Sequence, residues 1–337
     1  RRRSGYLSEF LNFATALMLP VAAVTMKIDL TVLIVLGLIR SFLVFGGPSA
    51  RKSLVPDVAD KAGMTLERAN SIHESIAGAG FATGPALAAL LISWINPYNT
   101  FYVIALFGLI SAAFAFAIRV HEKHEPHDES ESKSFFHFAT QGFRVLFSTP
   151  SVLILMVALL SLSMIYLPTE MVILPRYFNE TADPAGLGII LSAMAATAGL
   201  GSLMFEWIAK RLSFSNIMRV GLIGVALTVV VMSFLPDYWI LLAMGLLLGA
   251  FWGPLGPLLN TVIQRKVPAN MRGRVFSLEM TIWTGGPMIS MVIVGAALDW
   301  FGVQPVYFVI AALTLISALL VAFNKRAPEL NTAEYQD

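Results

Sequence analysis

One apolar segment of the sequence, residues 151–172, carries three polar side chains at helical spacing. Ser163, Tyr166 and Glu170 stand at positions i, i+3 and i+7, which brings side chains to one face of an α-helix. A carboxyl group on that face could bind a proton or a cationic small molecule. Glu170 lies close to one end of the segment, so simple exposure to water is an equal alternative.

A second candidate is Arg40, which falls inside the apolar segment formed by residues 30–47. An arginine at the centre of a membrane-spanning helix costs about 2.5–3.5 kcal/mol on insertion scales, unless it meets water or a partner. Arg40 is therefore a candidate functional group. The alternative is that its long side chain reaches the membrane interface and keeps its charge in water.

A third candidate, Asn260, ends a row of glycines in the apolar segment formed by residues 238–263. The row has spacings of four and three residues and consists of Gly245, Gly249, Gly253 and Gly256. Small residues in such a row allow close helix approach, so the row predicts a packing seam. Asn260 could still line a path for a solute, with Trp252 as an amphipathic contact.

Other groupings that carry chemistry are missing from the sequence. It has no cysteine, which excludes disulfides and thiolate metal sites, and no G-x-x-x-x-G-K-[ST] loop for ATP. The apolar segments hold no nucleophile with a base, so we expect neither enzymatic activity nor a bound cofactor or metal. The polar stretch 121–141 contains spaced histidines that could hold a divalent cation, but a solvated linker is the favoured interpretation.

The composition explains why these candidates lie in apolar segments. Hydrophobic residues make up 57% of the 337 residues, charged residues make up 13%, and the mean hydropathy is +0.74. The net charge of +2 is too small to indicate a nucleic-acid partner. Apolar blocks of this length predict an all-α polytopic membrane protein with about ten transmembrane helices. The expected spans are residues 6–26, 30–47, 72–95, 101–118, 151–172, 185–207, 217–235, 238–263, 275–298 and 306–323.

Basic residues are distributed unequally between the loops on the two sides of these spans. Of 23 lysines and arginines, 20 lie in loops on the side of the N-terminus, and only Lys27 and Arg176 lie in loops on the other. Cytoplasmic loops retain basic residues. We therefore expect a multi-pass protein of the inner (plasma) membrane, with both termini of this chain in the cytoplasm.

The two halves of the sequence share short repeats. Val-Ile-Ala at 103–105 recurs at 309–311, and Leu-Ile-Ser-Ala at 109–112 recurs at 315–318. Chance agreement among apolar residues is the alternative to duplication. If duplication holds, two helices precede residue 1 and the whole has twelve helices in two bundles. The expected parts are an incomplete N-terminal bundle at 1–119 (inferred helices 3–6), a cytoplasmic linker at 120–149, a C-terminal six-helix bundle at 150–325 and a cytoplasmic tail at 326–337.

Several motifs resemble those of the major facilitator superfamily, in particular its proton-coupled drug-efflux branch with macrolide-efflux-like proteins. The basic run at residues 1–3 is similar to the end of that family's loop between helices two and three. Arg40, followed by Gly46 and Gly47, resembles the arginine of the fourth helix, which implies a part in proton coupling. The resemblance covers essentially the whole chain and implies a two-bundle fold of the major-facilitator type.

A glycine–proline signature carries the expectation of export. Gly78, Gly80, Gly84 and Pro85 resemble the fifth-helix signature of antiporters, although alanines replace its final glycines. In the second half, Gly286 and Pro287 match Gly84 and Pro85. These residues imply roles in helix packing or gating, and packing alone explains them equally well.

Together these features predict a secondary transporter that exports small amphipathic or hydrophobic compounds by proton antiport and alternating access. Its expected partners are a small-molecule substrate, protons and the lipid bilayer, and we expect a monomer. The residues expected to serve transport are Arg40, Glu170, Tyr166 and Asn260. A nutrient importer and a divalent-cation exporter remain as alternatives, and a membrane enzyme is disfavoured.

Overall fold

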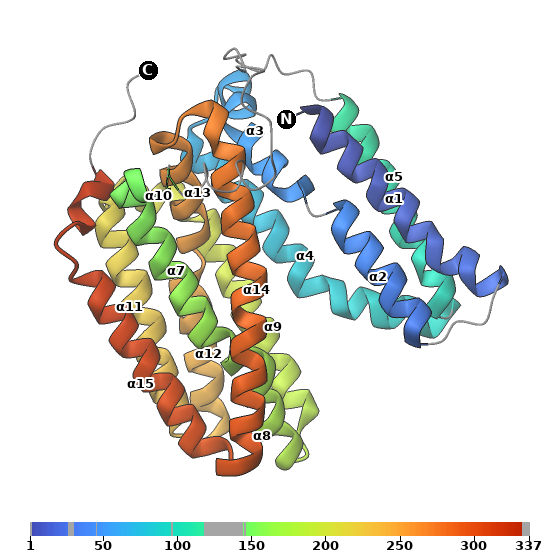
Figure 1. The fold of residues 1–337 in the computed structure, drawn as a ribbon. Helices are drawn as coiled ribbons and strands as arrows, with labels where there is room; N and C mark the ends of the chain where they lie inside the picture. Colours follow the sequence, from blue (N-terminus) through green and yellow to red (C-terminus); the bar gives the residue numbers. More distant parts are fainter. Residues whose placement is uncertain are drawn as a thin grey trace. The chain divides into compact units, whose positions relative to one another are not determined.

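The computed structural model describes residues 2–25, 30–44, 46–95, 97–117, 144 and 146–331. Throughout these residues the regular elements are helices, and most of them follow the apolar segments of the sequence (Figure 1). Long helices satisfy their own backbone hydrogen bonds, which a chain in hydrocarbon requires. The expectation of an all-helical polytopic membrane protein is confirmed.

The described chain forms two compact units. The first takes in residues 2–64 and 83–117, and the second takes in 65–82 and 144–331. The first half of the fourth helix thus belongs to the second unit. The elements before residue 118 are α1 (Arg2–Thr25), α2 (Leu30–Val44), α3 (Gly46–Ala62), α4 (Leu66–Ile95) and α5 (Pro97–Ala117).

Helix α1 is the centre of the first unit, because it packs along α5 and also contacts α2 and α3. Gly108 of α5 permits the close approach to α1. A Cβ at this position would lie 3.1 Å from the backbone nitrogen of Phe13. Helix α3 lies where the sequence predicted a loop, since this helix is too polar to stand out in a search for apolar runs.

The second unit is a bundle of longer helices. Its core consists of α7 against α14 and α15, α11 against α12 and α15, and α9 against α12. Its elements after residue 145 are α7 (Pro150–Pro168), η2 (Thr169–Ile173, a π-helix), α8 (Leu174–Glu180), α9 (Pro184–Leu203), α10 (Phe205–Ala209), α11 (Phe214–Ser233), α12 (Tyr238–Trp252), α13 (Leu255–Lys266), α14 (Ala269–Phe301), α15 (Val303–Ala322) and η3 (Ala327–Asn331, a 3-10 helix).

The predicted packing seam lies between α12 and α9. A Cβ at Gly249 would overlap the carbonyl oxygen of Met194, and one at Gly253 would overlap the carbonyl oxygen of Ala198. Neither backbone oxygen can yield as a flexible side chain would. Glycine is therefore required at both positions, and the packing-seam prediction is confirmed.

Two expected spans are interrupted. Residues 238–263 divide into α12 and α13 at Gly253 and Pro254. Proline has no backbone N–H for the helical ladder, so it breaks the helix here. Residues 151–172 continue from α7 into the π-helix η2 directly after Pro168. Hydropathy alone does not detect either interruption, because the apolar character runs through both.

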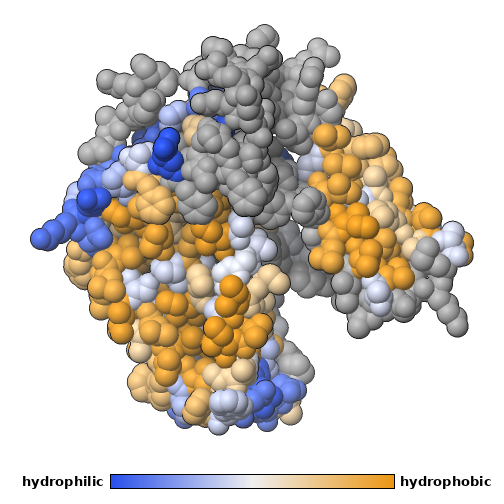
Figure 2. Space-filling view, in the orientation of Figure 1, coloured by the Kyte–Doolittle hydropathy of each residue, from blue (hydrophilic) through white to orange (hydrophobic). Residues whose placement is uncertain are grey.

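Seven helical stretches in the described residues are long and apolar enough to cross a bilayer, and α1 contributes a shorter apolar run at Leu7–Ala22. Figure 2 shows a broad apolar surface over the middle of the second unit and hydrophilic side chains at its two ends. On α15, Val309, Leu313, Ile316 and Leu320 are all exposed on one face. Such a belt with polar ends fits a bilayer-spanning bundle.

Candidate functional site

Glu170 lies in the π-helical turn between α7 and α8. Pro168 cannot donate a backbone hydrogen bond, and the turn that follows is wider, with the N–H of Leu174 bonded to the carbonyl oxygen of Thr169. The Tyr166 hydroxyl donates a hydrogen bond of 3.3 Å to Oε2 of Glu170. The predicted pair of Tyr166 and Glu170 is therefore in contact.

Two tryptophans extend this pair into a row of aromatic rings. The Tyr166 ring lies 5.2 Å from the Trp252 ring, and the Trp252 ring lies 5.9 Å from the Trp283 ring, measured between centroids. Three helices, α7, α12 and α14, supply one ring each. We call Tyr166, Glu170, Trp252 and Trp283 the acid–aromatic cluster.

The members of this cluster differ in burial. Tyr166 is only 3% exposed, whereas Glu170, Trp252 and Trp283 are partly exposed. Ser163, predicted on the same helix face, is fully buried and donates its hydroxyl to the carbonyl oxygen of Leu160. Ser163 is therefore satisfied locally and is not part of the cluster. The cluster therefore combines a partly exposed carboxylate with two partly exposed indole rings.

Gly286 and Pro287 lie in α14 next to this region. A Cβ at Gly286 would lie 2.9 Å from Cγ and Sδ of Met164, so a small residue here lets α14 approach α7. Pro287 is buried within α14. The predicted packing role is consistent with this contact, and a gating role stays a prediction.

The matching glycines of α4 have a different environment. Among the described atoms, none lies within 4 Å of a Cβ built at Gly78, Gly80 or Gly84. Pro85 lies within the same helix. The role of this signature in packing or gating also stays a prediction.

Asn260 lies in a polar contact between α13 and the first half of α4. Its amide nitrogen donates a hydrogen bond of 2.6 Å to Oε1 of Glu74. One turn away, the Asn70 amide donates to Oε1 of Gln264 at 2.6 Å and to Oγ1 of Thr261 at 3.0 Å. These contacts join helices that are almost 200 residues apart in sequence.

An ion pair between Arg265 and Glu67 lies at one end of the same contact between α4 and α13. On α4, Glu67, Asn70 and Glu74 stand at i, i+3 and i+7, which places them on one face. We call this contact the α4–α13 zipper, and its members are Glu67, Asn70, Glu74, Asn260, Thr261, Gln264 and Arg265. Of these residues, the sequence singled out only Asn260 as functional.

Trp252 of the acid–aromatic cluster and the zipper residues of α13 lie on the two sides of the helix break at Gly253 and Pro254. Trp252, Gly256, Asn260 and Gln264 follow at intervals of four residues along α12 and α13. Gly256 faces the Glu74 carboxylate, since a Cβ there would lie 3.4 Å from Oε2 of Glu74. One face of α13 therefore contacts α4 at Gly256, Asn260 and Gln264.

Arg40 has its partner in the first unit. Its Nη2 donates a hydrogen bond of 2.7 Å to Oδ1 of Asn12, which joins α2 to α1. Arg40 is partly buried. A second pair in this unit is the buried Glu9 of α1 with Arg51 of α3. The sequence did not identify Asn12 or Arg51 as partners, because neither spacing nor type marks them.

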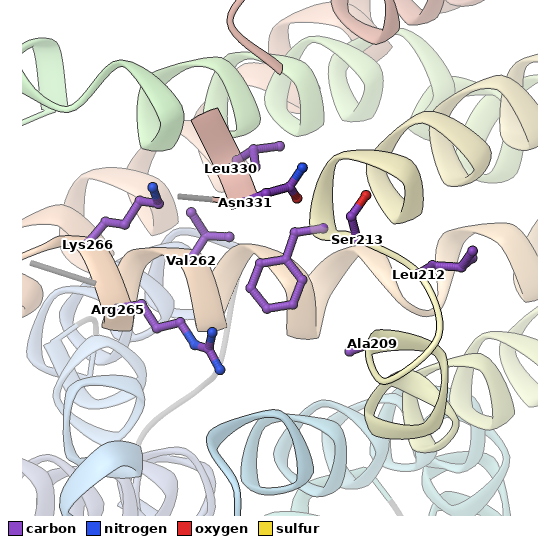
Figure 3. A pocket seen from close by; sticks show the side chains of 9 residues that line it. Ala209, Leu212, Ser213, Val262, Arg265, Lys266, Leu330 and Asn331 are labelled. Atoms are coloured by element: carbon purple, nitrogen blue, oxygen red, sulfur yellow. The ribbon is translucent and has the colours of Figure 1, made fainter. Parts of the chain in front are cut away.

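A cavity of about 260 Å³ lies at the basic end of the second unit, where α13 ends beside α11 and η3 (Figure 3). Arg265 and Lys266 line it, together with Ser213 and Asn331. Both cations have partners, because Arg265 pairs with Glu67 and the Lys266 ammonium donates to the carbonyl oxygen of Glu329 at 2.7 Å. The cavity therefore adjoins the zipper without offering an unpaired charge.

Metal binding was considered for the histidine-rich stretch at 121–141, which lies outside the described residues. Within the part of the chain that the structure describes, no group of three or more histidine, aspartate or glutamate side chains is arranged to hold a metal ion.

Comparison with known proteins agrees with this architecture. The family model described as Major Facilitator Superfamily matches residues 1–181 and 169–336. The protein named multidrug efflux pump Tap of Mycolicibacterium fortuitum is 27% identical over 337 residues, which is 99% of this chain and 82% of that protein. Tap of Mycobacterium tuberculosis strain H37Rv is 28% identical over 343 residues, which is 100% of this chain and 81% of that protein.

Solved structures share the fold at low sequence identity. The transporter FucP in its outward conformation superposes with a TM-score of 0.69 and 14% identity, covering 95% of this chain and 82% of that chain. A bacterial homologue of the iron transporter ferroportin, in its outward-facing state, has a TM-score of 0.66 and 17% identity, covering 96% of this chain and 82% of that chain.

Proposed function

This chain belongs to the major facilitator superfamily, and from that premise we propose that it exports small amphipathic or hydrophobic compounds in exchange for protons. The chain is a multi-pass membrane transporter and not an enzyme. The observation that carries the direction of transport is the similarity along the whole chain to proteins named multidrug efflux pumps. The glycine–proline signature of α4 supports the same direction.

The acid–aromatic cluster supports the proposed substrate class. Ring faces from Tyr166, Trp252 and Trp283 supply apolar contact area, and Glu170 supplies one charged group. Sites for drug-like compounds are mostly apolar, with a few polar groups that fix orientation. A sugar would need more hydrogen-bonding side chains than this cluster has, which disfavours uptake of a polar nutrient.

The α4–α13 zipper supports transport by alternating access. It holds the first half of α4 against α13 through one ion pair and three hydrogen bonds. These contacts are polar and lie at the basic end, so they can open without exposing a large apolar core. We propose that the zipper closes the path on the cytoplasmic side and opens when the substrate enters from there.

Proton coupling is assigned to Arg40 and Glu170. Arg40 is a cation within an apolar helix and is held by the neutral Asn12, so a change of charge nearby would shift its position. Glu170 is a carboxylic acid within an apolar stretch, and it can take up or release a proton. We propose that these two groups link proton movement to the two states of the zipper.

The unequal distribution of basic residues supports the proposed orientation. With the basic ends on the cytoplasmic side, residues 2–3 and the end of η3 both lie in the cytoplasm, in the inner membrane of the cell. We propose a monomer, because the major-facilitator fold encloses its path within one chain. A divalent-cation exporter would need the histidine-rich stretch at 121–141 as its metal site.

Uptake into everted membrane vesicles tests this function. In such vesicles the cytoplasmic face is outside, so an exporter accumulates its substrate when respiration acidifies the lumen. We expect lipophilic dyes and antibiotics to accumulate, and accumulation to disappear when a protonophore collapses the gradient. Vesicles with the Arg40→Ala variant should behave like vesicles without the protein. Accumulation of a nutrient in right-side-out vesicles alone would contradict export.

A further inference from the structure

The carboxylate of Glu170 is unusual because it has no cationic partner. It lies in the stretch Pro150–Glu180, which is apolar and long enough to span a bilayer. Among the described residues, no lysine, arginine or histidine pairs with it. Arg176, the next cation along the chain, bonds to Glu180 at 2.8 Å and lies 3.7 Å from Asp299.

The Tyr166 hydroxyl provides part of the hydrogen bonding of the Glu170 carboxylate. It donates one hydrogen bond of 3.3 Å, while a carboxylate can accept about four. Tyr166 is almost fully buried, which fixes the hydroxyl and therefore the position of Glu170. Glu170 itself is partly exposed, so its carboxylate can accept further hydrogen bonds from a ligand.

The aromatic row supplies the second part of a binding site. The faces of indole rings carry negative electrostatic potential, and a cation over such a face gains about 0.5–2 kcal/mol. Trp252 and Trp283 are partly exposed, and Trp252 packs directly on the ring of Tyr166, which holds Glu170. A ligand that stacks on Trp252 would therefore lie near Tyr166 and the carboxylate that Tyr166 holds.

We propose that the acid–aromatic cluster is a recognition site for organic cations, such as quaternary ammonium, phosphonium or protonated amine compounds that carry aromatic groups. The cationic centre binds beside Glu170, and the aromatic groups stack on Trp252 and Trp283. This proposal rests on the proposed function as an exporter and names the substrate class of the same site. An anionic amphiphile would be repelled, because every charged or ring-face contact in the cluster is electronegative.

Binding of a matched pair of probes tests the proposal. Tetraphenylphosphonium is a cation with four phenyl groups, and triphenylphosphine oxide is a neutral compound with three phenyl groups on the same kind of centre. Both are titrated against the purified full chain in lipid nanodiscs, and the dissociation constant is measured by calorimetry. We expect Glu170→Gln to weaken tetraphenylphosphonium binding about tenfold and to change triphenylphosphine oxide binding less than twofold. We expect Trp283→Leu to weaken both probes, because it removes a stacking face.

Controls separate recognition from folding and from proton coupling. Glu206→Gln removes a partly exposed carboxylate that pairs with Lys210 at the basic end, and it should leave both dissociation constants unchanged. Glu170→Asp keeps the charge and should retain most of the preference for the cation. Equal affinity of the wild type and Glu170→Gln for tetraphenylphosphonium would overturn the proposal. The proposal would also be overturned if Glu170→Gln weakened the binding of both probes equally.

The same variants distinguish this proposal from the function on which it rests. If Glu170 serves only as a proton carrier, Glu170→Gln abolishes gradient-dependent export of neutral and cationic compounds alike, with tetraphenylphosphonium affinity intact, and cation recognition is refuted. If the wild type exports nothing under a gradient, yet binds the cation through Glu170, the exporter function fails and cation recognition stands.

Discussion

The α4–α13 zipper can be opened by one substitution. In Arg265→Ala, Glu67 loses its ion-pair partner, and the carboxylate remains in a position where only 13% of its side chain is exposed. The hydrogen bonds of Asn70 and Glu74 stay in place. We predict that this variant opens the zipper more often than the wild type does.

The expected loss of free energy from the closed zipper follows from the exposure of the Arg265–Glu67 ion pair. Fully exposed ion pairs contribute up to about 1 kcal/mol, and breaking a buried pair costs about 3–5 kcal/mol. With Arg265 34% exposed and Glu67 13% exposed, the pair is neither fully exposed nor fully buried, so the expected cost lies between these two limits. A loss of about 1.5 kcal/mol corresponds to a roughly tenfold change in the ratio of open to closed molecules.

A single introduced cysteine measures this ratio, because the sequence has no cysteine of its own. Ser71 is the position of choice, since it lies on α4 beside Asn70 and is only 2% exposed. Its hydroxyl has no hydrogen-bond partner among the described residues, so a thiol replaces it at little cost. In everted vesicles, we expect a membrane-impermeant maleimide to label Ser71→Cys about tenfold faster when Arg265→Ala is added.

Two controls make the result specific. The double swap Glu67→Arg with Arg265→Glu restores the ion pair with its charges reversed, and it should return the labelling rate toward that of Ser71→Cys alone. Ser151→Cys lies on α7, is 4% exposed and has no role in the zipper, so Arg265→Ala should leave its labelling unchanged. If the Ser71→Cys rate does not respond to Arg265→Ala, the zipper is not a gate held by this pair.

Three further outcomes follow from the structure. Tyr166→Phe removes the hydrogen bond to Glu170 and should raise the concentration of cationic substrate needed for half-maximal export about threefold to tenfold, measured in vesicle transport, with maximal export retained. Gly249→Val would collide with α9 and should lower the melting temperature in detergent by several degrees, whereas Gly285→Ala, with open space around its Cβ, should leave it unchanged or slightly raised. Arg40→Lys keeps the charge but loses the planar guanidinium that reaches Asn12, so gradient-dependent export should fall while thermal stability stays close to wild type.

The sequence was sufficient for the packing seam and for most of the spans, since seven of the ten expected spans coincide with described helices that are long and apolar enough to cross a bilayer. Apolar length predicts membrane helices because a chain in hydrocarbon must satisfy its own backbone groups. The glycine spacing from 245 to 253 predicts a close approach because only a residue without a side chain fits there. In both cases a local pattern determines the outcome, and the structure agrees.

The contacts of the zipper could not be predicted from local sequence patterns alone. Glu67, Asn70 and Glu74 share one face of α4, and this spacing is visible in the sequence. It does not reveal which helix they meet, because the partners on α13 are almost 200 residues away. Anchoring at the membrane interface and contact with another helix give the same sequence signal, so the spacing alone could not predict the hydrogen bond between Glu74 and Asn260.

The acid–aromatic cluster was predicted in part. Tyr166, Glu170 and Trp252 were identified from spacing and residue type, whereas Trp283 was not singled out at all. Its position depends on how α14 packs against α7, where a Cβ at Gly286 would lie 2.9 Å from the side chain of Met164. The π-helical turn that carries Glu170 also had no signal beyond Pro168, because a proline predicts a break or kink without its form.

The most direct test of proton-coupled export is proton movement driven by the substrate itself. The full-length protein is reconstituted in proteoliposomes that contain a pH-sensitive dye, without any imposed gradient, and a lipophilic cation is added outside. Antiport predicts that the lumen becomes alkaline as the substrate enters and protons leave, and that Arg40→Ala abolishes the change. Acidification of the lumen by the entering substrate would indicate symport, and substrate entry without a pH change would indicate uncoupled transport; either result would contradict the account.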